Sequence, residues 1–277
     1  MSGDNPYADG RGNKDRSIAN PHGAGDAPYP GKSGKAVPVG GDAPFLIGEN
    51  MTGGYGKGPD ILHDCTIAVN PGEIAVIVGP NGAGKSTAMK AVFGMLNVRS
   101  GRVLLDGEDI TTLTPQDRVI KGMGFVPQVR NIFPSMTVEE NLEMGAFIRK
   151  DDIRQTMEQV YELFPILKDK RAQAAGELSG GQRQQVAVGR ALMTKPKVLM
   201  LDEPTAGVSP IVMDELFDRI IEVSRTGIPI LMVEQNAKQA LEIADRGYVL
   251  VQGRNGHTGT GKELLADPEV RQSFLGG

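Results

Sequence analysis

Cysteine is nearly absent from this 277-residue chain, and long apolar runs are missing altogether. The only cysteine, Cys65, has no partner for a disulfide within the chain, and no Cys/His cluster has the spacing of a metal site. No apolar run approaches the roughly 18 residues that a membrane-spanning helix needs. The N-terminus also lacks the charged-then-apolar pattern of a signal peptide. We therefore expect a soluble protein of a reducing compartment, whose role at a membrane would depend on a partner.

An excess of charge of either sign is also missing. The chain has 30 basic and 34 acidic residues, which gives a formal net charge of −4. Proteins that follow the phosphates of a nucleic acid usually carry a basic excess, so we expect no nucleic-acid partner. Hydrophobic residues make up 39% of the sequence, which is enough for the core of one large α/β domain or two small ones.

Large apolar side chains are scarce in residues 1–44, where glycine and proline accumulate. Nine glycines and six prolines make up about a third of this segment, and its five basic and five acidic residues cancel. A segment of this composition buries too little surface to offset its ordering entropy. We predict that residues 1–44 form a disordered tail, with a docking role as the alternative, and that residues 45–277 form the folded domain.

The rest of the chain alternates short apolar runs with helical patterns. The runs are typical of strands that are buried on both faces, and they cover residues 74–78, 103–105, 198–201 and 228–233. Helices are predicted over residues 85–96, 210–224 and 237–244, and from Asp267 onward. Strands that alternate with helices indicate an α/β fold with a parallel sheet and right-handed crossovers.

Strand signals disappear between residues 137 and 170. Thr137 is followed by acidic residues, which is typical of a helix start. Helical periodicity then continues, with one break near Lys150. We predict a mostly helical insertion within the α/β domain, over about residues 129–178.

A glycine-rich segment links the apolar run at 74–78 to the predicted helix. Its residues match the P-loop pattern G-x-x-x-x-G-K-[ST]: Gly79, Pro80, Asn81, Gly82, Ala83, Gly84, Lys85 and Ser86. Glycine lets successive N–H groups turn inward around phosphate oxygens, and the helix N-terminus adds a partial positive charge. Lys85 can then reach the β- and γ-phosphates, Ser86 can supply an oxygen ligand to Mg²⁺, and Thr87 can make a further phosphate contact. A glycine-rich turn without a ligand is the alternative, but the strand before it and the helix after it favour the binding of ATP and Mg²⁺.

Two carboxylates end the apolar run at 198–201. Asp202 is placed at the end of a strand beside the P-loop, where it can hold Mg²⁺ through the water shell of the metal. Glu203 is the next residue and could orient or deprotonate the attacking water. A strand that ends in a solvated Asp-Glu pair is common, so these roles depend on the P-loop as well.

A second candidate for phosphate binding follows Leu178. It opens a helical stretch predicted over residues 182–193, where an anion is favoured, and it consists of Ser179, Gly180, Gly181 and Gln182. We do not expect one chain to place two phosphate-binding helix N-termini on the same γ-phosphate, so the second N-terminus would act on a nucleotide of another subunit. A simple Ser-Gly-Gly helix cap is the alternative. Arg183 and Arg190 on this helix are expected on a solvated face, the alternative being contact with a neighbouring subunit.

The P-loop, the Leu-Ser-Gly-Gly-Gln segment and the Asp-Glu pair occur in the order and spacing of the ABC ATPase family, which this chain resembles over roughly residues 45–275. The resemblance implies an α/β fold with a P-loop NTPase parallel-sheet core, an N-terminal antiparallel β part and the helical insertion. It also implies ATP hydrolysis in a head-to-tail dimer, in which each ATP lies between the P-loop of one subunit and the Ser179 segment of the other.

Other positions acquire roles only through this resemblance. Tyr55 lies where an aromatic residue usually stacks on adenine, the alternative being a surface tyrosine. Gln128 resembles the glutamine that senses Mg²⁺ and the γ-phosphate, the alternative being a turn residue after Pro127. The helical insertion that follows Gln128 faces the transmembrane partner in this family.

Two positions depart from the family pattern. Ser209 stands where the family usually has an aspartate at the subunit interface, and Gln235 stands where it has a switch histidine. Gln235 can hydrogen-bond a phosphate oxygen, but unlike histidine it carries no titrating proton. We therefore expect Glu203 and electrostatic positioning to supply most of the rate enhancement, with Gln235 as the second catalytic residue.

These departures and the sequence before the last helix resemble the second ATPase subunit, the F-type, of branched-chain amino-acid importers, and its relative in urea importers. The resemblance implies a heterodimer with another ATPase subunit, a homodimer being the alternative, on two transmembrane permeases that a substrate-binding protein feeds. The chain would then lie at the cytoplasmic face of the membrane. A soluble ABC-type ATPase of a cofactor-assembly complex is the alternative outside transport.

Overall fold

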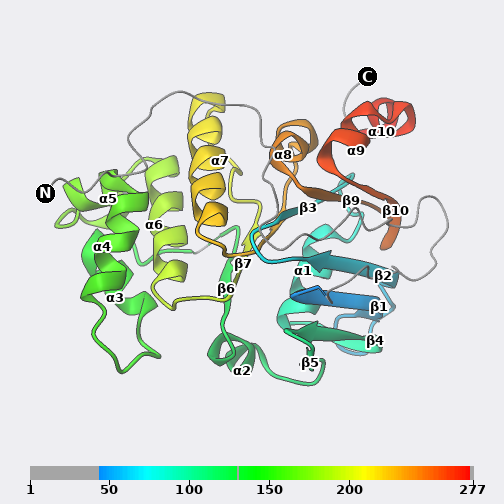
Figure 1. Cartoon of the computed structure of the whole chain (residues 1–277), viewed down its shortest axis with the longest axis horizontal. Coiled ribbons are helices and arrows are strands. Elements are labelled where there is room, and N and C mark those ends of the chain that lie inside the picture. Colours follow the sequence, from blue (N-terminus) through cyan, green and yellow to red (C-terminus); the bar gives the residue numbers. More distant parts are fainter. Residues whose placement is uncertain (1–43, 130, 275–277) are drawn as a thin grey trace, which may run out of the picture.

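Figure 1 shows the computed structural model, which describes residues 44–129 and 131–274. The tail predicted for residues 1–44 lies outside the described residues, apart from its last one. In this view a four-stranded sheet lies on the right, a six-stranded sheet passes through the centre, and a group of helices lies on the left. None of the described helices is both long enough and apolar enough to span a membrane.

The six-stranded sheet has the strand order β10-β9-β3-β8-β7-β6. Its strands are β3 (Ile74–Val78), β6 (Met123–Val126), β7 (Val198–Asp202), β8 (Ile230–Val233), β9 (Arg246–Val251) and β10 (Arg254–Gly259). All neighbouring strands pair in parallel except β10, which pairs antiparallel with β9 at the edge. The structure therefore has the predicted parallel sheet, which contains the apolar runs at 74–78, 198–201 and 228–233, whereas the run at 103–105 lies in a second, antiparallel sheet.

Strand β3 separates two hydrophobic cores. Ile74, Val76 and Val78 pack with residues of the helical insertion in one core. Ala75 and Ile77 point to the other face and pack in a second core with helix α1 (Lys85–Phe93). Because both faces are buried, the strand is apolar throughout instead of alternating with polar residues.

The four-stranded sheet is antiparallel, with the order β2-β1-β4-β5. Its strands are β1 (Leu46–Gly54), β2 (Leu62–Val69), β4 (Asn97–Leu105) and β5 (Glu108–Asp109). Helix α1 joins this sheet to the six-stranded one, because Ala88, Met89 and Val92 share a core with residues of both sheets. The helix that begins directly after the P-loop is thus fixed from two sides.

The helices on the left of Figure 1 lie in the predicted insertion of about residues 129–178 and directly after it. They are α3 (Val138–Gly145), α4 (Arg154–Leu163), α5 (Pro165–Asp169), the 3-10 helix η1 (Ala175–Glu177) and α6 (Gly180–Leu192). The remaining helices are α2 (Pro115–Ile120), α7 (Pro210–Arg225), α8 (Ala237–Ile243), α9 (Gly261–Ala266) and α10 (Pro268–Phe274). Helix α1 ends three residues before the predicted boundary, because Gly94 caps it in the left-handed region with φ 84°.

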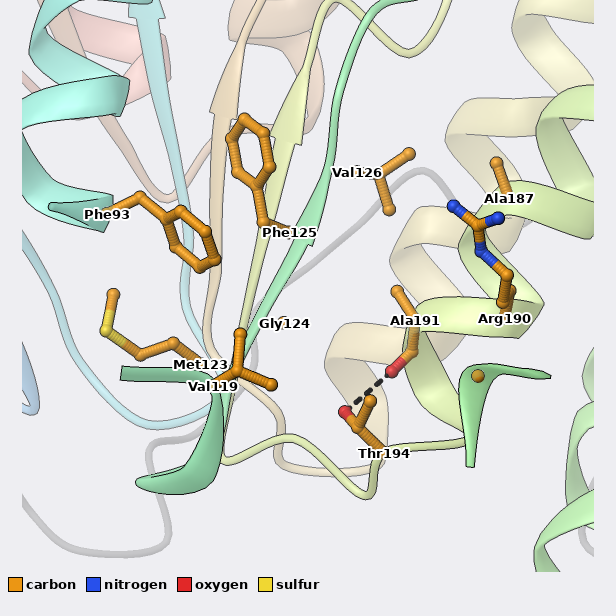
Figure 2. A pocket seen from close by; sticks show the side chains of 11 residues that line it. Phe93, Val119, Met123, Gly124, Phe125, Val126, Ala187, Arg190, Ala191 and Thr194 are labelled. Carbon is orange, nitrogen blue, oxygen red and sulfur yellow. Dashed lines mark hydrogen bonds between the residues drawn. The ribbon is translucent and has the colours of Figure 1, made fainter. Parts of the chain in front are cut away.

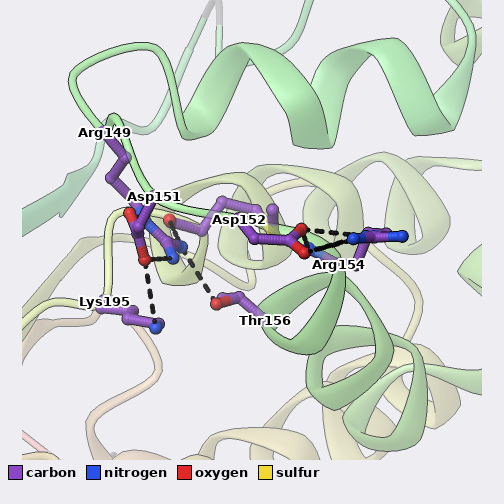
Figure 3. A network of polar contacts seen from close by, with 7 residues as sticks. Arg149, Asp151, Asp152, Arg154, Thr156 and Lys195 are labelled. Carbon is purple, nitrogen blue, oxygen red and sulfur yellow. Dashed lines mark hydrogen bonds and ion pairs between the residues drawn. The ribbon is translucent and has the colours of Figure 1, made fainter.

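Figure 3 shows a polar network that joins the helices of the insertion. The Arg149 side chain, which is 7% exposed, forms an ion pair with Asp151. Its guanidinium also donates to Thr156 Oγ1 at 3.0 Å and to Met193 O at 2.8 Å. Thr156 belongs to α4 and Met193 follows α6, so the break predicted near Lys150 is a turn held by its neighbours.

Arg118 on α2 offers a test of what holds the fold together. The side chain is 1% exposed, and its guanidinium donates to four main-chain carbonyl oxygens, those of Ala91, Val92, Thr111 and Leu113. Burial lowers the pKa of Arg118 to about 10, so the group stays charged at neutral pH.

Arg118→Met should lower the free energy of unfolding by about 3 kcal/mol, because it leaves buried carbonyl groups without donors. Chemical denaturation of the two proteins measures this difference. Arg102→Met is the matched control, since the exposed ion pair of Arg102 with Glu49 should contribute little. Equal effects of the two substitutions would show that the buried guanidinium has no special role.

Candidate functional site

The P-loop lies between β3 and α1, and its glycines have backbone conformations that few other residues adopt. Gly79, Gly82 and Gly84 have φ values of 146°, 80° and 94°. At Gly79 a side chain is also excluded by space, because a Cβ atom would lie 2.3 Å from Leu250 O on β9. The sequence therefore needs glycine here to let the main chain pass against the sheet.

Lys85 begins α1 and closes the P-loop on itself. Its Nζ donates to Gly79 O at 2.9 Å and to Pro80 O at 3.2 Å, and the side chain is 6% exposed. Burial lowers the pKa of Lys85, and the carboxylates of Glu203 and Asp202 oppose this change. A cation thus lies inside the loop, close to two carboxylates from another strand.

Two of the residues predicted to bind Mg²⁺ lie side by side. Ser86 Oγ donates to Asp202 Oδ1 at 3.0 Å, which joins the first turn of α1 to the end of β7. Burial raises the pKa of Asp202, and the hydrogen bond from Ser86 opposes that rise. A hydroxyl and a carboxylate oxygen at this distance form the kind of oxygen donor set that Mg²⁺ prefers.

Gln128 and Glu203 are also brought together. Gln128, in the loop after β6, donates from Nε2 to Glu203 Oε2 at 2.7 Å. Glu203 has φ 48°, in the left-handed region where residues with side chains are uncommon. Its backbone N–H donates to Val233 O at the end of β8, at 2.9 Å. The Glu203 carboxylate thus lies at the edge of the sheet, where the Gln128 amide holds the side chain and the hydrogen bond to Val233 holds the strained main chain.

Gln235 lies at the next loop, directly after β8, and is exposed. Its main-chain N–H donates to a side-chain oxygen of Glu234 at 3.2 Å. Glu234 itself is 1% exposed and also accepts hydrogen bonds from Thr205. Neither Glu234 nor Thr205 was singled out from the sequence. No local pattern connects two residues that lie 29 positions apart.

The Ser179 segment caps α6, on the other side of the molecule from the four-stranded sheet (Figure 1). Ser179 Oγ accepts from Gln182 N at 3.3 Å, and Gln182 Oε1 accepts from Ser179 N at 3.1 Å, which makes a capping box. Ser179 and Gly180 are exposed. Among the described residues, no hydrogen bond or ion pair joins this segment to the P-loop of the same chain.

The two glycines of the segment differ in what the chain requires of them. A Cβ atom at Gly181 would lie 2.1 Å from Val212 Cγ1 on α7, so Gly181 allows α6 and α7 to approach each other. A Cβ atom at Gly180 would meet only Val208 Cγ1, at 3.8 Å, which is an ordinary contact. The fold therefore explains Gly181 but leaves Gly180 unexplained.

Gly180→Ala should leave the chain folded, because alanine also favours a helix. If the segment contacts a nucleotide on another subunit, the same substitution should lower ATP hydrolysis by the assembled dimer, by roughly tenfold or more. Thermal unfolding and ATPase assays measure the two effects separately. Gly181→Ala is the matched control, in which stability and activity should fall together. A loss of stability in Gly180→Ala as large as in Gly181→Ala would point to a structural role only.

Tyr55 follows β1 directly and is 46% exposed. Its loop is held by Arg99 on β4, whose guanidinium donates to Gly56 O at 3.1 Å and to Gly58 O at 2.6 Å and forms an ion pair with Asp60. The tyrosine ring is therefore free to take a stacking partner on a loop whose backbone is fixed. The contribution of Arg99 was not predicted from the sequence.

A pocket of about 200 Å³ lies between β6 and α6 (Figure 2). Phe93 and Phe125 stack on one side of it, with their ring centroids 4.7 Å apart, and Arg190 lies on the other side. The prediction of a solvated Arg190 is wrong. The side chain is half-buried, burial lowers its pKa, and its guanidinium lies 5.0 Å from the centroid of the Phe133 ring.

Comparison with known proteins gives one family. The model of the ABC transporter family matches residues 62–206. The chain is 46% identical to BraG of Pseudomonas aeruginosa, a high-affinity branched-chain amino acid transport ATP-binding protein, over 80% of this chain and 96% of that protein. It is 42% identical to LivF of Archaeoglobus fulgidus, a probable protein of the same kind, over 82% of this chain and 96% of that protein. It is also 36% identical to LptB of Haemophilus influenzae, which is named for lipopolysaccharide export, over 84% of this chain and 97% of that protein.

Solved structures agree with these relatives. An ATP-binding cassette of an ABC transporter, MJ1267 in its ADP conformation, has a TM-score of 0.77 and 32% identity, and the match covers 85% of this chain and 100% of that one. A nucleotide-free cassette has a TM-score of 0.75 with the same identity and coverage.

Proposed function

Because this chain belongs to the ABC transporter family of ATP-binding subunits, we propose that it hydrolyses ATP to energise an importer of branched-chain amino acids. The observation that carries the substrate is the 46% identity to BraG over 96% of that protein, next to 42% identity to LivF. Identity to the exporter subunit LptB is lower, at 36%. The α/β fold, with its parallel core, antiparallel β part and helical insertion, is that of ABC ATPase cassettes.

The proposed catalytic centre lies where β3, β7 and β8 end. The P-loop and Lys85 bind the phosphates, and Thr87 adds a further contact. Glu203 orients the attacking water and accepts its proton, while Gln128 fixes that carboxylate through the 2.7 Å hydrogen bond. Gln235 reaches a phosphate oxygen from the exposed loop after β8. These side chains lie on α1 or in loops that follow strands of the central sheet, so the sheet fixes their positions before ATP binds.

The residues around Asp202 fit a magnesium ion. The paired oxygens of Ser86 and Asp202 are hard donors, and Asp202 is buried with a raised pKa for which a cation would compensate. Gln128 could add its amide oxygen, since its hydrogen bond to Glu203 uses Nε2. When bound, Mg²⁺ supplies charge neutralisation for the phosphate oxygens.

The proposal includes a second ATPase subunit. The exposed Ser179 segment has no bonded contact with the P-loop of its own chain, and Gly180 has no structural reason to be glycine. Both observations support contact with a nucleotide held by a companion subunit, and Tyr55 would stack on the adenine bound to this one. We propose a heterodimer, with a homodimer as the alternative.

The proposed contact surface for the permeases is the pocket between β6 and α6 and the apolar residues around it. Exposed apolar side chains occur near the C-terminal end of α3 and in the loop after Gln128: Val129, Phe133, Met144, Phe147 and Ile148. Arg190 connects this group to the pocket through its contact with Phe133. Exposed apolar side chains beside a pocket suit a short apolar helix of a permease, and we propose that the chain lies peripherally at the cytoplasmic face of the membrane.

Reconstitution with two candidate permeases, a second ATPase subunit and a binding protein from the same genome tests the proposal. Proteoliposomes should accumulate labelled leucine, isoleucine or valine only with ATP, and only with a functional Glu203. Labelled urea and a short amide serve as competing substrates. Uptake of urea without uptake of leucine would overturn the substrate, and failure to co-purify with any permease would favour a soluble cofactor-assembly ATPase.

A further inference from the structure

Glu234 lies at the meeting point of the three strands that carry the proposed catalytic centre. It follows β8 directly, and its side chain is 1% exposed. Its main-chain N–H donates to Ile77 O at 3.1 Å, on the strand that leads into the P-loop. On the other side of β8, Glu203 N donates to Val233 O at 2.9 Å. The backbone around Glu234 therefore touches both the P-loop strand and the strand of Glu203.

The Glu234 carboxylate accepts hydrogen bonds from three donors. One oxygen accepts from Thr205 N at 3.0 Å and from Thr205 Oγ1 at 2.9 Å. The other oxygen accepts from Gln235 N at 3.2 Å. A carboxylate accepts at both oxygens, whereas a glutamine would present N–H groups to one of these donors. The three hydrogen bonds are therefore best satisfied by the ionised acid.

We propose that Glu234 is a positioning residue for ATP hydrolysis, which ties the loop after β7 to Gln235 and so fixes the arrangement of Glu203. The inference rests on the proposed function. Thr205 lies two residues beyond Glu203, and the chain then becomes exposed at Ala206 and Gly207. Glu203 has a strained φ of 48°, which persists only where neighbouring contacts hold it. The bonds from Thr205 to the buried carboxylate supply such contacts.

The charge of Glu234 gives this role a signature in pH. Burial raises the pKa of Glu234 to about 7, the hydrogen bonds from Thr205 and Gln235 oppose the rise, and the negative charge of Glu203 adds to it. Glu203, which directly follows β7, is the charged group that acts on the pKa of Glu234 among the described residues, and the hydrogen-bond partners of Glu234 do not titrate. Protonation weakens the oxygen that carries the proton as an acceptor, so we expect the three hydrogen bonds to be strongest above about pH 7.

Activity and stability should therefore change in opposite directions with pH. Because the folded-state pKa is raised, the neutral acid stabilises the fold, and this contribution is lost as pH rises through about 7. Over the same rise in pH, the hydrogen bonds that Glu234 accepts from Thr205 and Gln235 become stronger, and these bonds position Glu203. If Glu234 had only a structural role, ATPase activity and thermal stability would instead change in the same direction with pH.

The test uses Glu234→Gln in the full-length chain assembled with its partner subunits. We expect kcat to fall roughly 10- to 100-fold, as for a small misplacement of a catalytic group. The KM for ATP should stay within about twofold, because the P-loop is untouched. The wild type should lose rate between about pH 8 and pH 6, and this loss should disappear in the variant. Thermal unfolding of the variant above neutral pH should show no loss of stability that could account for its lower kcat.

Controls separate this inference from the proposed function. Glu263→Gln on α9 also changes a carboxylate that accepts from a threonine N–H, Thr260 at 2.7 Å, but lies outside the site and should leave kcat and its pH profile unchanged. If the wild type hydrolyses ATP and Glu203→Gln does not, a Glu234→Gln variant with wild-type kcat and pH profile overturns the inference alone. A kcat loss that follows a loss of thermal stability also overturns it. An assembled wild type without ATPase activity overturns both proposals.

Discussion

Glu203→Gln should reduce ATP hydrolysis by roughly 100-fold or more while leaving ATP binding intact. The substitution removes the basic carboxylate but keeps an amide oxygen that can still accept the hydrogen bond from Gln128, which spans 2.7 Å in the wild type. Lys85, Ser86 and the P-loop keep their contacts, so the affinity for nucleotide should not fall. Steady-state ATPase rates and titration with a fluorescent ATP analogue measure the two quantities.

In the proposed dimer ATP joins the two subunits, so the same variant, mixed with its partner subunit, should also accumulate as an ATP-bound dimer. Size-exclusion chromatography with ATP and Mg²⁺ would show this species. Glu222→Gln on α7 is the matched control, since this carboxylate pairs with Arg219 on the surface. A Glu203→Gln protein that kept more than about a tenth of the wild-type rate would place the base elsewhere.

The parts of the site that the sequence predicts are the ones encoded by consecutive residues. The P-loop, the Asp202–Glu203 pair and the Ser179 segment each occupy one short stretch, and the strand or helix beside each is strongly patterned. The runs at β3, β7 and β8 also follow from the sequence, because a strand buried on both faces is apolar at every position.

Several strands have no such pattern. In β1 the pairing shifts between Gly48 and Met51 and again before Gly53, so buried and exposed residues do not alternate. The edge strand β10 consists largely of polar residues and glycine, and its strand pairing comes from β9 alone. Helix α9 was missed for a different reason. Its Thr260–Glu263 capping box is legible in the sequence, but the helix has only six residues.

Contacts between distant segments account for the rest. The carboxylate of Glu234 meets Thr205 only because β7 and β8 are neighbours in the sheet. Arg190 is half-buried because β6 and the loop carrying Phe133 come against α6. The sequence periodicity of a single helix or strand predicts neither the Glu234–Thr205 contact nor the burial of Arg190. These residues surround the sequence motifs and are not part of them.

Lys85→Ala should weaken ATP binding by roughly 100-fold, which corresponds to about 3 kcal/mol for charge-assisted hydrogen bonds to phosphate. Lys85 Nζ is held within the P-loop by Gly79 O and Pro80 O, close to where the helix end and the main-chain N–H groups attract an anion. Its charge is already desolvated, since burial lowers the pKa, so a phosphate would compensate for that penalty. Equilibrium binding of MgATP to the full-length chain measures the effect.

Two further variants separate charge from geometry at this position. Lys85→Arg keeps the charge, but a planar guanidinium does not fit between two carbonyl oxygens of a tight loop, so it should restore little of the affinity. Lys121→Ala removes a lysine that pairs with Glu108 on the surface and should bind ATP as the wild type does. Because the loop loses two hydrogen bonds in Lys85→Ala, thermal unfolding must be measured beside binding. Unchanged affinity in a folded Lys85→Ala protein would mean that the main-chain N–H groups alone hold the nucleotide.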